Sequence, residues 1–187
     1  MVSLIELWEP ILASAGAVFV GTTIIHMLLP VHKKDYGKLG DKEDVVLAAV
    51  RSWGLRGGMY MFPMYDPKGK KDPERQRKEK EGPWGVLTVR DKDYNFGAMM
   101  GLWLLNILII STLVGYLASV TLAAGAACPS VFRIVATAAI LAYGGSALTD
   151  SIWKGRPWRC LPGAIFDAVV NAAITGGMFV WLWPKVV

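Results

Sequence analysis

Cysteine and histidine are scarce in this chain of 187 residues, which has only two of each. Two cysteines, Cys128 and Cys160, are too few for a disulfide framework, and they do not form a C-x-x-C pair. The G-x-S-x-G and H-E-x-x-H signatures and the phosphate-binding loop are also missing. These absences argue against the familiar hydrolase, metalloprotease and nucleotide-binding classes, and we assign no residue a catalytic role.

The chain also lacks the polarity of a soluble domain, since 53% of it is hydrophobic and its mean hydropathy is +0.38. Each of four apolar runs has roughly the 17–25 residues that a helix needs to cross a bilayer. Without barrel-like alternation, only helices satisfy the backbone in lipid. The sequence predicts an all-α membrane protein with a bundle of four transmembrane helices. This interpretation is favoured over a soluble protein with four buried helices. The runs are Ile11–Leu29, Gly97–Leu122, Val131–Thr149 and Leu161–Trp183.

Positive charge is concentrated between the first two runs, where residues 31–95 hold fifteen of the twenty lysines and arginines. Cytoplasmic segments collect these residues, so we place 31–95 and the short basic link 153–160 in the cytoplasm. The N-terminus, the uncharged link 121–130 and the C-terminus then lie outside. The net charge of +5 reflects this orientation, so nucleic acid is not an expected partner.

Three parts follow from this pattern: the N-terminal segment with the first transmembrane helix (1–30), a small cytoplasmic α+β insertion (31–95), and the remaining transmembrane helices (96–187). In the insertion, residues 41–53 predict an amphipathic helix that is capped by Asp41. This helix rests either on the anionic membrane surface or on the rest of the insertion. Alternating runs at 59–64 and 84–89 predict a hairpin. The charged tip between them, residues 66–82, is expected to be solvated or a short helix.

The two histidines lie close together in the sequence, with His26 before Pro30 and His32 after it. With Asp35 they offer imidazole and carboxylate donors, a reasonable ligand set for a metal ion. The favoured alternative is that His26 bonds to a neighbouring helix and His32 is an interfacial side chain. The proline between them leaves their relative position undetermined.

A polar cluster is expected in the cytoplasmic third of the bundle. A functional interpretation is a proton or ion path, or a pocket for a lipid headgroup. The structural interpretation, which we favour from sequence, is that Asp167 pairs with Arg156 or Arg159 and fastens the last two spans together. The cluster comprises His26, Asp150, Asp167, Asn171, Arg156 and Arg159.

Further charged residues lie where the spans meet the membrane surfaces. Lys154, Arg156, Arg159 and Trp158 suit anionic lipid headgroups, although general membrane anchoring explains them equally well. At the outer end, Arg133 can snorkel or pair with Glu6 or Glu9. Cys128 and Cys160 fall on opposite faces in this topology, so no intrachain disulfide is expected.

Several stretches together form a recognisable pattern: His26–Pro30 with His32 and Asp35-Tyr36, Tyr60–Pro63, Gly82–Val89, Tyr116–Ala118, Val131–Arg133 and Trp181–Pro184. In these stretches the chain resembles a family of uncharacterised bacterial integral membrane proteins. The resemblance covers most of the chain, although residues 68–80 are more heavily charged than the family pattern. It implies a bacterial inner membrane, and no activity.

The function favoured by the sequence is that of a non-catalytic accessory or scaffolding subunit in a larger membrane complex. One alternative is a small oligomeric transporter or channel that uses Asp150, Asp167 and Asn171. Another is an enzyme acting on lipid at the inner leaflet, with His26 or His32 and Asp167 as acid and base. No cofactor is expected, and a bound lipid is compatible with these features. The expected partners are membrane lipids, anionic on the cytoplasmic side, and a protein partner or further copies of this chain.

Overall fold

The computed structural model describes residues 2–64, 72–90 and 95–185 and divides into two compact units. One unit contains Met1–Asp35 and Asn95–Val187, and the other contains Tyr36–Tyr94. The segment from Val31 to Asp35 therefore belongs with the helical bundle, although the sequence pattern grouped it with the insertion. This assignment matters because it includes His32 and Asp35.

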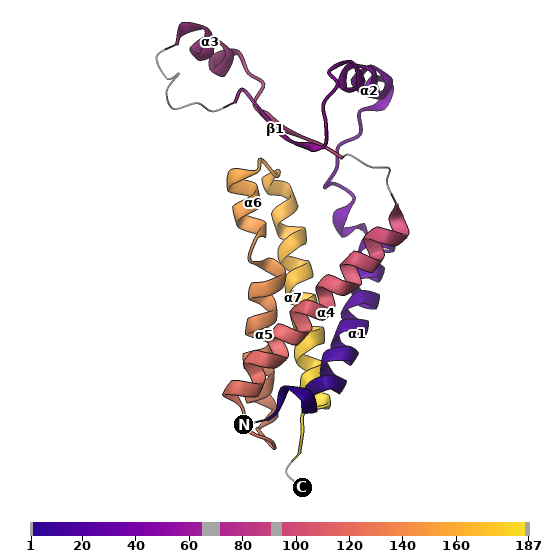
Figure 1. Cartoon of the computed structure of the whole chain (residues 1–187), viewed down its shortest axis with the longest axis vertical. Helices are drawn as coiled ribbons and strands as arrows, with labels where there is room; N and C mark the ends of the chain where they lie inside the picture. The colour runs from indigo at the N-terminus through magenta and orange to yellow at the C-terminus, as the bar shows by residue number, and fades with distance from the viewer. Residues whose placement is uncertain (1, 65–71, 91–94, 186–187) are drawn as a thin grey trace. The chain divides into compact units, whose positions relative to one another are not determined.

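The first unit is a bundle of long helices that run antiparallel in succession (Figure 1). Within the described residues, four helical segments are long and apolar enough to cross a membrane: Leu4–Met27, Phe96–Thr121, Cys128–Trp153 and Trp158–Trp181. They contain α1 (Trp8–Met27), α4 (Phe96–Thr121), α5 (Cys128–Gly144) with α6 (Ala147–Trp153), and α7 (Leu161–Trp181). The chain is thus mostly helical, and the expected number of apolar helices is confirmed.

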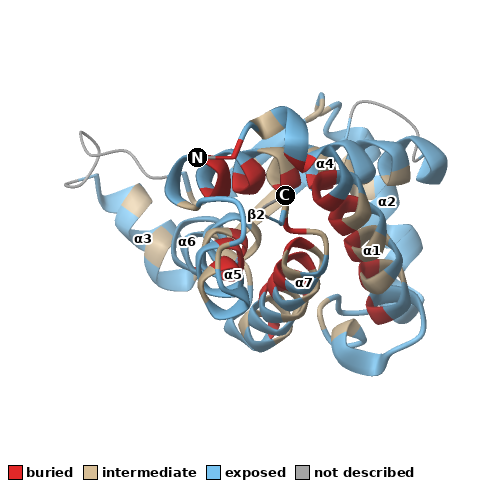
Figure 2. Ribbon diagram, turned by 90° about the horizontal axis from the view of Figure 1, so that it is seen from below, coloured by how far each residue is buried: buried red, intermediate tan, exposed pale blue. Residues whose placement is uncertain are grey.

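The bundle is closed by contacts of α1 with α4 and α7, and of α5 with α4 and α7. The pair α5 and α7 makes the most extensive contacts, as the small residues of these spans predict. Leu7, Val114, Val135 and Phe179 are among the buried side chains of the main core cluster. The buried residues gather on the inner faces of the helices, while most outward residues are exposed (Figure 2). An apolar exterior of this kind suits lipid.

The third span is interrupted, which the sequence pattern did not predict. Instead of one helix over 131–149, α5 ends at Gly144 and α6 begins at Ala147. Two consecutive glycines followed by Ser146 explain the break, because glycine weakens a helix interior and Gly/Ser pairs are common places for helices to kink.

The second unit contains α2 (Glu43–Ser52), α3 (Pro73–Glu81) and a two-stranded antiparallel sheet. Strands β1 (Gly58–Phe62) and β2 (Gly85–Val89) pair with Tyr60 opposite Leu87, which confirms the predicted hairpin. Asp41 does not cap α2, because it lies in a 3-10 turn at Gly40–Lys42.

Part of the charged tip is helical. Asp72 caps α3 by accepting from the backbone N–H of Glu74, and the pairs Arg75–Glu79 and Arg77–Glu81 link successive turns at 2.8 Å. Such pairs at i and i+4 stabilise an exposed helix. Residues 66–71 of the predicted tip lie outside the described residues.

Candidate metal centre

The two histidines of the chain stack on one another at the end of α1. Leu29 has extended backbone because the following Pro30 disfavours a helical conformation, and Pro30 then starts a 3-10 turn that ends at His32. This turn returns the chain toward α1. The ring centroids of His26 and His32 lie 4.1 Å apart, with an angle of 6° between the ring planes.

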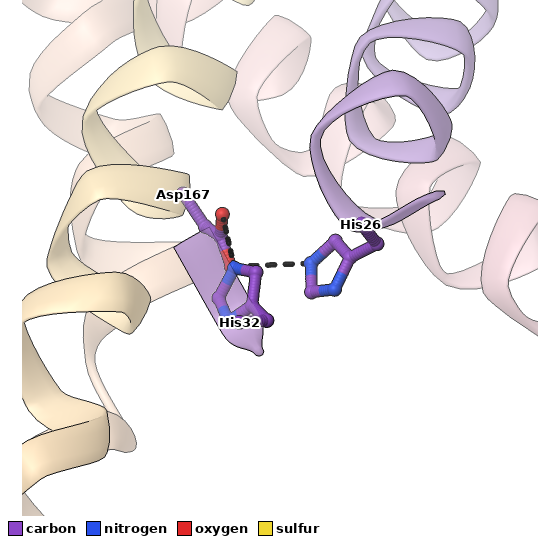
Figure 3. Close-up of side chains that lie close together, drawn as sticks. All are labelled: His26, His32 and Asp167. Atoms are coloured by element: carbon purple, nitrogen blue, oxygen red, sulfur yellow. Dashed lines mark hydrogen bonds and ion pairs between the residues drawn. The ribbon is translucent and has the colours of Figure 1, made fainter. Parts of the chain in front are cut away.

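Asp167 of α7 joins the two histidines. Its Oδ2 lies 3.2 Å from Nε2 of His26, and both carboxylate oxygens lie 3.1 Å from Nε2 of His32. Figure 3 shows the three side chains converging from the end of α1, from the following turn and from α7. Their donor atoms all lie within 4.8 Å of one another. His32 and Asp167 are half-buried, whereas the side chain of His26 is 45% exposed.

A second carboxylate lies on the other side of His32. The Oδ2 of Asp35 is 3.0 Å from Nδ1 of His32, and a guanidinium nitrogen of Arg156 is 3.6 Å from the same oxygen. When both ring nitrogens are protonated, Nδ1 donates to Asp35 and Nε2 donates to Asp167; when Nε2 is unprotonated, its lone pair is available to a metal ion. Burial lowers the pKa of His32, but hydrogen bonds to Asp35 and Asp167 and the charges of both carboxylates outweigh it and raise the pKa above its ordinary value. The surroundings of His32 therefore favour positive charge.

The turn that carries His32 and Asp35 is fastened to the start of α7. Arg159 Nε donates to the carbonyl oxygen of Lys34 at 3.2 Å, and the thiol of Cys160 lies 3.7 Å from the carbonyl oxygen of Asp35. Gly163 faces the imidazole of His32 at close range. These contacts fix the backbone of the turn, and this in turn fixes the positions of His32 and Asp35.

A small polar cavity of about 160 Å³ lies beside the cluster. Buried Thr22 and Asn171 lie in its wall, where Thr22 Oγ1 donates to Asn171 Oδ1 at 3.2 Å. Its other lining residues are His26, Trp103, Tyr143, Ser146, Ala147, Arg156, Ala164 and Asp167.

The cluster is chemically suited to a divalent transition metal. Around a tetrahedral Zn²⁺ with bonds of about 2.0–2.1 Å, neighbouring ligand atoms are about 3.3 Å apart, close to the separations from Asp167 to the two histidines. The lone pairs of parallel rings do not converge, so one imidazole must tilt to bind the same ion. Asp35 behind His32 completes the carboxylate–histidine–metal arrangement that orients histidine ligands in many metal sites.

Comparisons with known proteins do not add to the evidence from this geometry. No protein-family model, curated protein or solved structure matches the chain.

The geometry of the cluster changes the set of metal ligands that the sequence suggested. His26 and His32 lie together as expected, but the third candidate ligand is Asp167, and Asp35 bonds to the far nitrogen of His32. Asp167 faces the histidines, and among the described residues its ion pairs are with them rather than with Arg156 or Arg159. The sequence singled out Asp167 as a member of the polar cluster with His26, but not as a metal ligand, because it is 135 residues from His32 in the chain.

The expected polar cluster assembles only in part. His26, Asp167, Asn171 and Arg156 line the same cavity. Asp150 instead pairs with Lys154 at 2.7 Å within the α6 segment, and Arg159 bonds to the backbone of Lys34.

In the part of the chain that the structure describes, some of the residues expected at the membrane surfaces have a charged partner, and others do not. Of the basic link residues, Lys154 and Arg156 have carboxylate partners, while Trp158 is exposed. Among the described residues, Arg133 forms no salt bridge with Glu6 or Glu9. Glu6 accepts from the backbone N–H of Ser3, and Arg133 lines a groove between α4 and α5.

Proposed function

We propose that this chain is an integral membrane protein that binds a divalent transition-metal ion at one end of its helical bundle. The ligands are His26, His32 and Asp167. The observation that supports the proposal best is the convergence of both histidines of the chain on one carboxylate, with Asp35 bonded to the remote nitrogen of His32. Imidazole with carboxylate suits Zn²⁺ and related ions.

The number of ligands indicates the kind of site. Structural zinc sites use four protein ligands, whereas sites that act on other molecules use three and keep a position for water or substrate. His26, His32 and Asp167 supply three ligands, and a polar cavity adjoins two of them. The site thus fits an ion that exchanges ligands, rather than one that only holds the fold together.

A competing explanation is that the cluster works without metal, as a set of ion pairs between α1, the following turn and α7. Two carboxylates around a protonated His32 would then hold the bundle end together. This explanation predicts that neither Zn²⁺ nor Co²⁺ binds, and that added Co²⁺ keeps the absorption it has in free solution. A metal-binding experiment therefore distinguishes the two explanations.

The test is metal binding by protein purified in mild detergent with an affinity tag that contains no histidine. Because the chain has only two histidines, any imidazole coordination belongs to this cluster. We expect about one Zn²⁺ or Co²⁺ per chain, with the visible absorption of tetrahedral Co²⁺. Asp167→Asn and His32→Ala should lose binding, and Asp150→Asn is the matched control. A wild-type protein without bound metal, or variants that bind as well as wild type, would overturn the proposal.

The membrane placement belongs to the same proposal. The end that carries the metal site also carries Lys33, Lys34 and Lys154, and lysine collects on the cytoplasmic side of membranes. We therefore place the metal ion at the cytoplasmic surface, in the bacterial inner membrane that the family resemblance implies.

We also propose that the protein serves as an accessory subunit, with the second unit as its contact surface. In that unit α2 has no buried residue, although Val45, Val46 and the following Trp53 lie on one face and are exposed. An exposed apolar stripe of this kind suits a partner or a membrane surface. Co-purification of a stoichiometric partner that the double variant Val46→Glu/Trp53→Glu releases supports this role. Purification of the chain alone from native membranes contradicts it.

A further inference from the structure

A second cavity adjoins the polar one and differs from it in character. It has a volume of about 340 Å³, an almost wholly apolar lining and a position between α1 and α4. Thr22, His26 and Trp103 line both cavities, so the two spaces adjoin at these side chains. One candidate ligand of the metal, His26, thus lies at the junction of a polar and an apolar space.

We propose that these two cavities together bind an amphiphile with an anionic head, a phosphate or a carboxylate, on an alkyl chain drawn from the bilayer. The head lies in the polar cavity against the metal ion and Arg156, and the chain lies in the apolar cavity. This inference rests on the proposed function, because the metal ion supplies the principal positive charge for the head.

The polar cavity favours an anionic head once the metal is bound. Three protein ligands leave a further coordination position on the ion, and an anionic oxygen is a suitable ligand for it. Arg156 lines the same cavity, and a guanidinium matches the geometry of phosphate and carboxylate. Asn171 and Thr22 add an amide and a hydroxyl. Without the ion, the negative charge of Asp167 would oppose such a head.

The apolar cavity favours an alkyl chain rather than a compact ligand. Met27, Phe96, Met100 and Trp103 form most of its wall, and Met27 and Phe96 are 65% and 53% exposed. It therefore opens to the outside of the bundle, where lipid chains lie when α1 and α4 cross a membrane. The polar cavity, at about 160 Å³, is small for a ligand site, but the apolar one lies within the usual range of about 300–1,000 Å³.

The experiment uses the full chain in lipid nanodiscs, loaded with Co²⁺, whose visible absorption reports on its ligands. The probes are octyl phosphate and octanoate, each below its micelle-forming concentration. Inorganic phosphate, acetate and octanol represent the isolated head and chain. We expect at least one amphiphile to change the spectrum at a concentration about tenfold lower than its bare head, because burial of the chain adds affinity. Octanol alone should leave the spectrum unchanged. Comparison of the two amphiphiles identifies the head.

Two neighbouring methionines provide matched variants. Met100 lines the apolar cavity and Met99 does not, so Met100→Trp should fill the space while Met99→Trp leaves it free. We expect Met100→Trp to bring octyl phosphate or octanoate to the affinity of its bare head, with metal content unchanged. Arg156→Gln should weaken the amphiphile and the bare head alike.

The outcomes separate the two proposals. Absence of bound metal overturns the proposed function and this inference with it. A protein that holds Co²⁺ but binds both amphiphiles no more tightly than their heads overturns the amphiphile alone. Equal effects of Met100→Trp and Met99→Trp also overturn it, because the chain would then lie elsewhere.

Discussion

Gly163 lies against the imidazole of His32, with room for a hydrogen atom and little more. A Cβ at Gly163 would be 3.0 Å from Cε1 and 3.3 Å from Nδ1 of that ring. This third residue of α7 therefore sets how closely the turn after α1 can approach the helix that carries Asp167. The glycine thus positions a proposed metal ligand from outside the ligand set.

Replacement of Gly163 by alanine should weaken metal binding while the bundle stays folded. The added methyl group moves His32 by a few tenths of an ångström, and metal sites depend on ligand placement within about 0.5 Å. We expect the Co²⁺ affinity to fall about tenfold, with a changed absorption spectrum, as for loss of an outer-shell contact. Gly177→Ala in the same helix is the control, since nothing lies within 4 Å of its Cβ position. Unchanged affinity in Gly163→Ala would contradict the assigned role of the glycine.

Asp35→Asn should reduce metal affinity without abolishing it. In the proposed site the Asp35 carboxylate orients His32 through Nδ1 and is not itself a ligand, and loss of such outer partners costs about 10–100-fold in affinity. Titration with Co²⁺ measures the change, and Asp41→Asn, in the exposed turn before α2, is the control. Complete loss of binding would show that Asp35 is itself a ligand, as the sequence pattern first indicated.

Gly176→Ala should destabilise the packing of α5 on α7. Its Cβ would lie 2.8 and 2.9 Å from ring carbons of Phe132, so the ring would have to move or the two helices separate locally. Such overpacking costs about 1–3 kcal/mol in the free energy of unfolding. Unfolding in mixed micelles, followed by circular dichroism, compares this variant with Gly177→Ala, which meets no neighbour. The packing argument fails if both variants unfold alike.

Labelling of two thiols on opposite sides of the bundle can determine the membrane orientation, but natural Cys160 is unsuitable as one of them. Cys128 is exposed, whereas Cys160 is only 2% exposed and will resist labelling from either side. Lys154, with a side chain 57% exposed, provides a better inner position. In a Cys160→Ala background, an impermeant maleimide should tag Cys128 in intact cells. It should reach Lys154→Cys only after the membrane is opened, and the reverse pattern would invert the topology.

Hydropathy and alternation predicted the apolar helices and the two strands of this protein, but not every helix boundary. The four apolar helices follow from runs long enough to cross a bilayer, and β1 with β2 follows from two alternating runs separated by a charged stretch. The break between α5 and α6 was missed because the apolar pattern continues through it. Its signal is local, in Gly144-Gly145-Ser146, and small residues of this kind are also common where helices pack closely in membranes.

The site was harder to predict because it depends on contacts between distant residues. The sequence singled out His26, His32 and Asp167, but it placed Asp35 among the ligands and paired Asp167 with arginine. Hydrophobic periodicity shows which face of α7 is buried, yet it does not show which turn of the chain covers that face. The close approach of His32 depends on Pro30 and Gly163, and neither residue has chemistry that would draw attention to it.

The stacked imidazoles have a practical consequence for spectroscopy. Because the chain has no other histidine, its imidazole ring protons give just two sets of nuclear magnetic resonance signals, and both come from the same few ångströms of the molecule. Each ring lies in the aromatic shielding field of the other, so a tilt of either one shifts both sets. The protein thus contains its own reporter of ring orientation, without any introduced label.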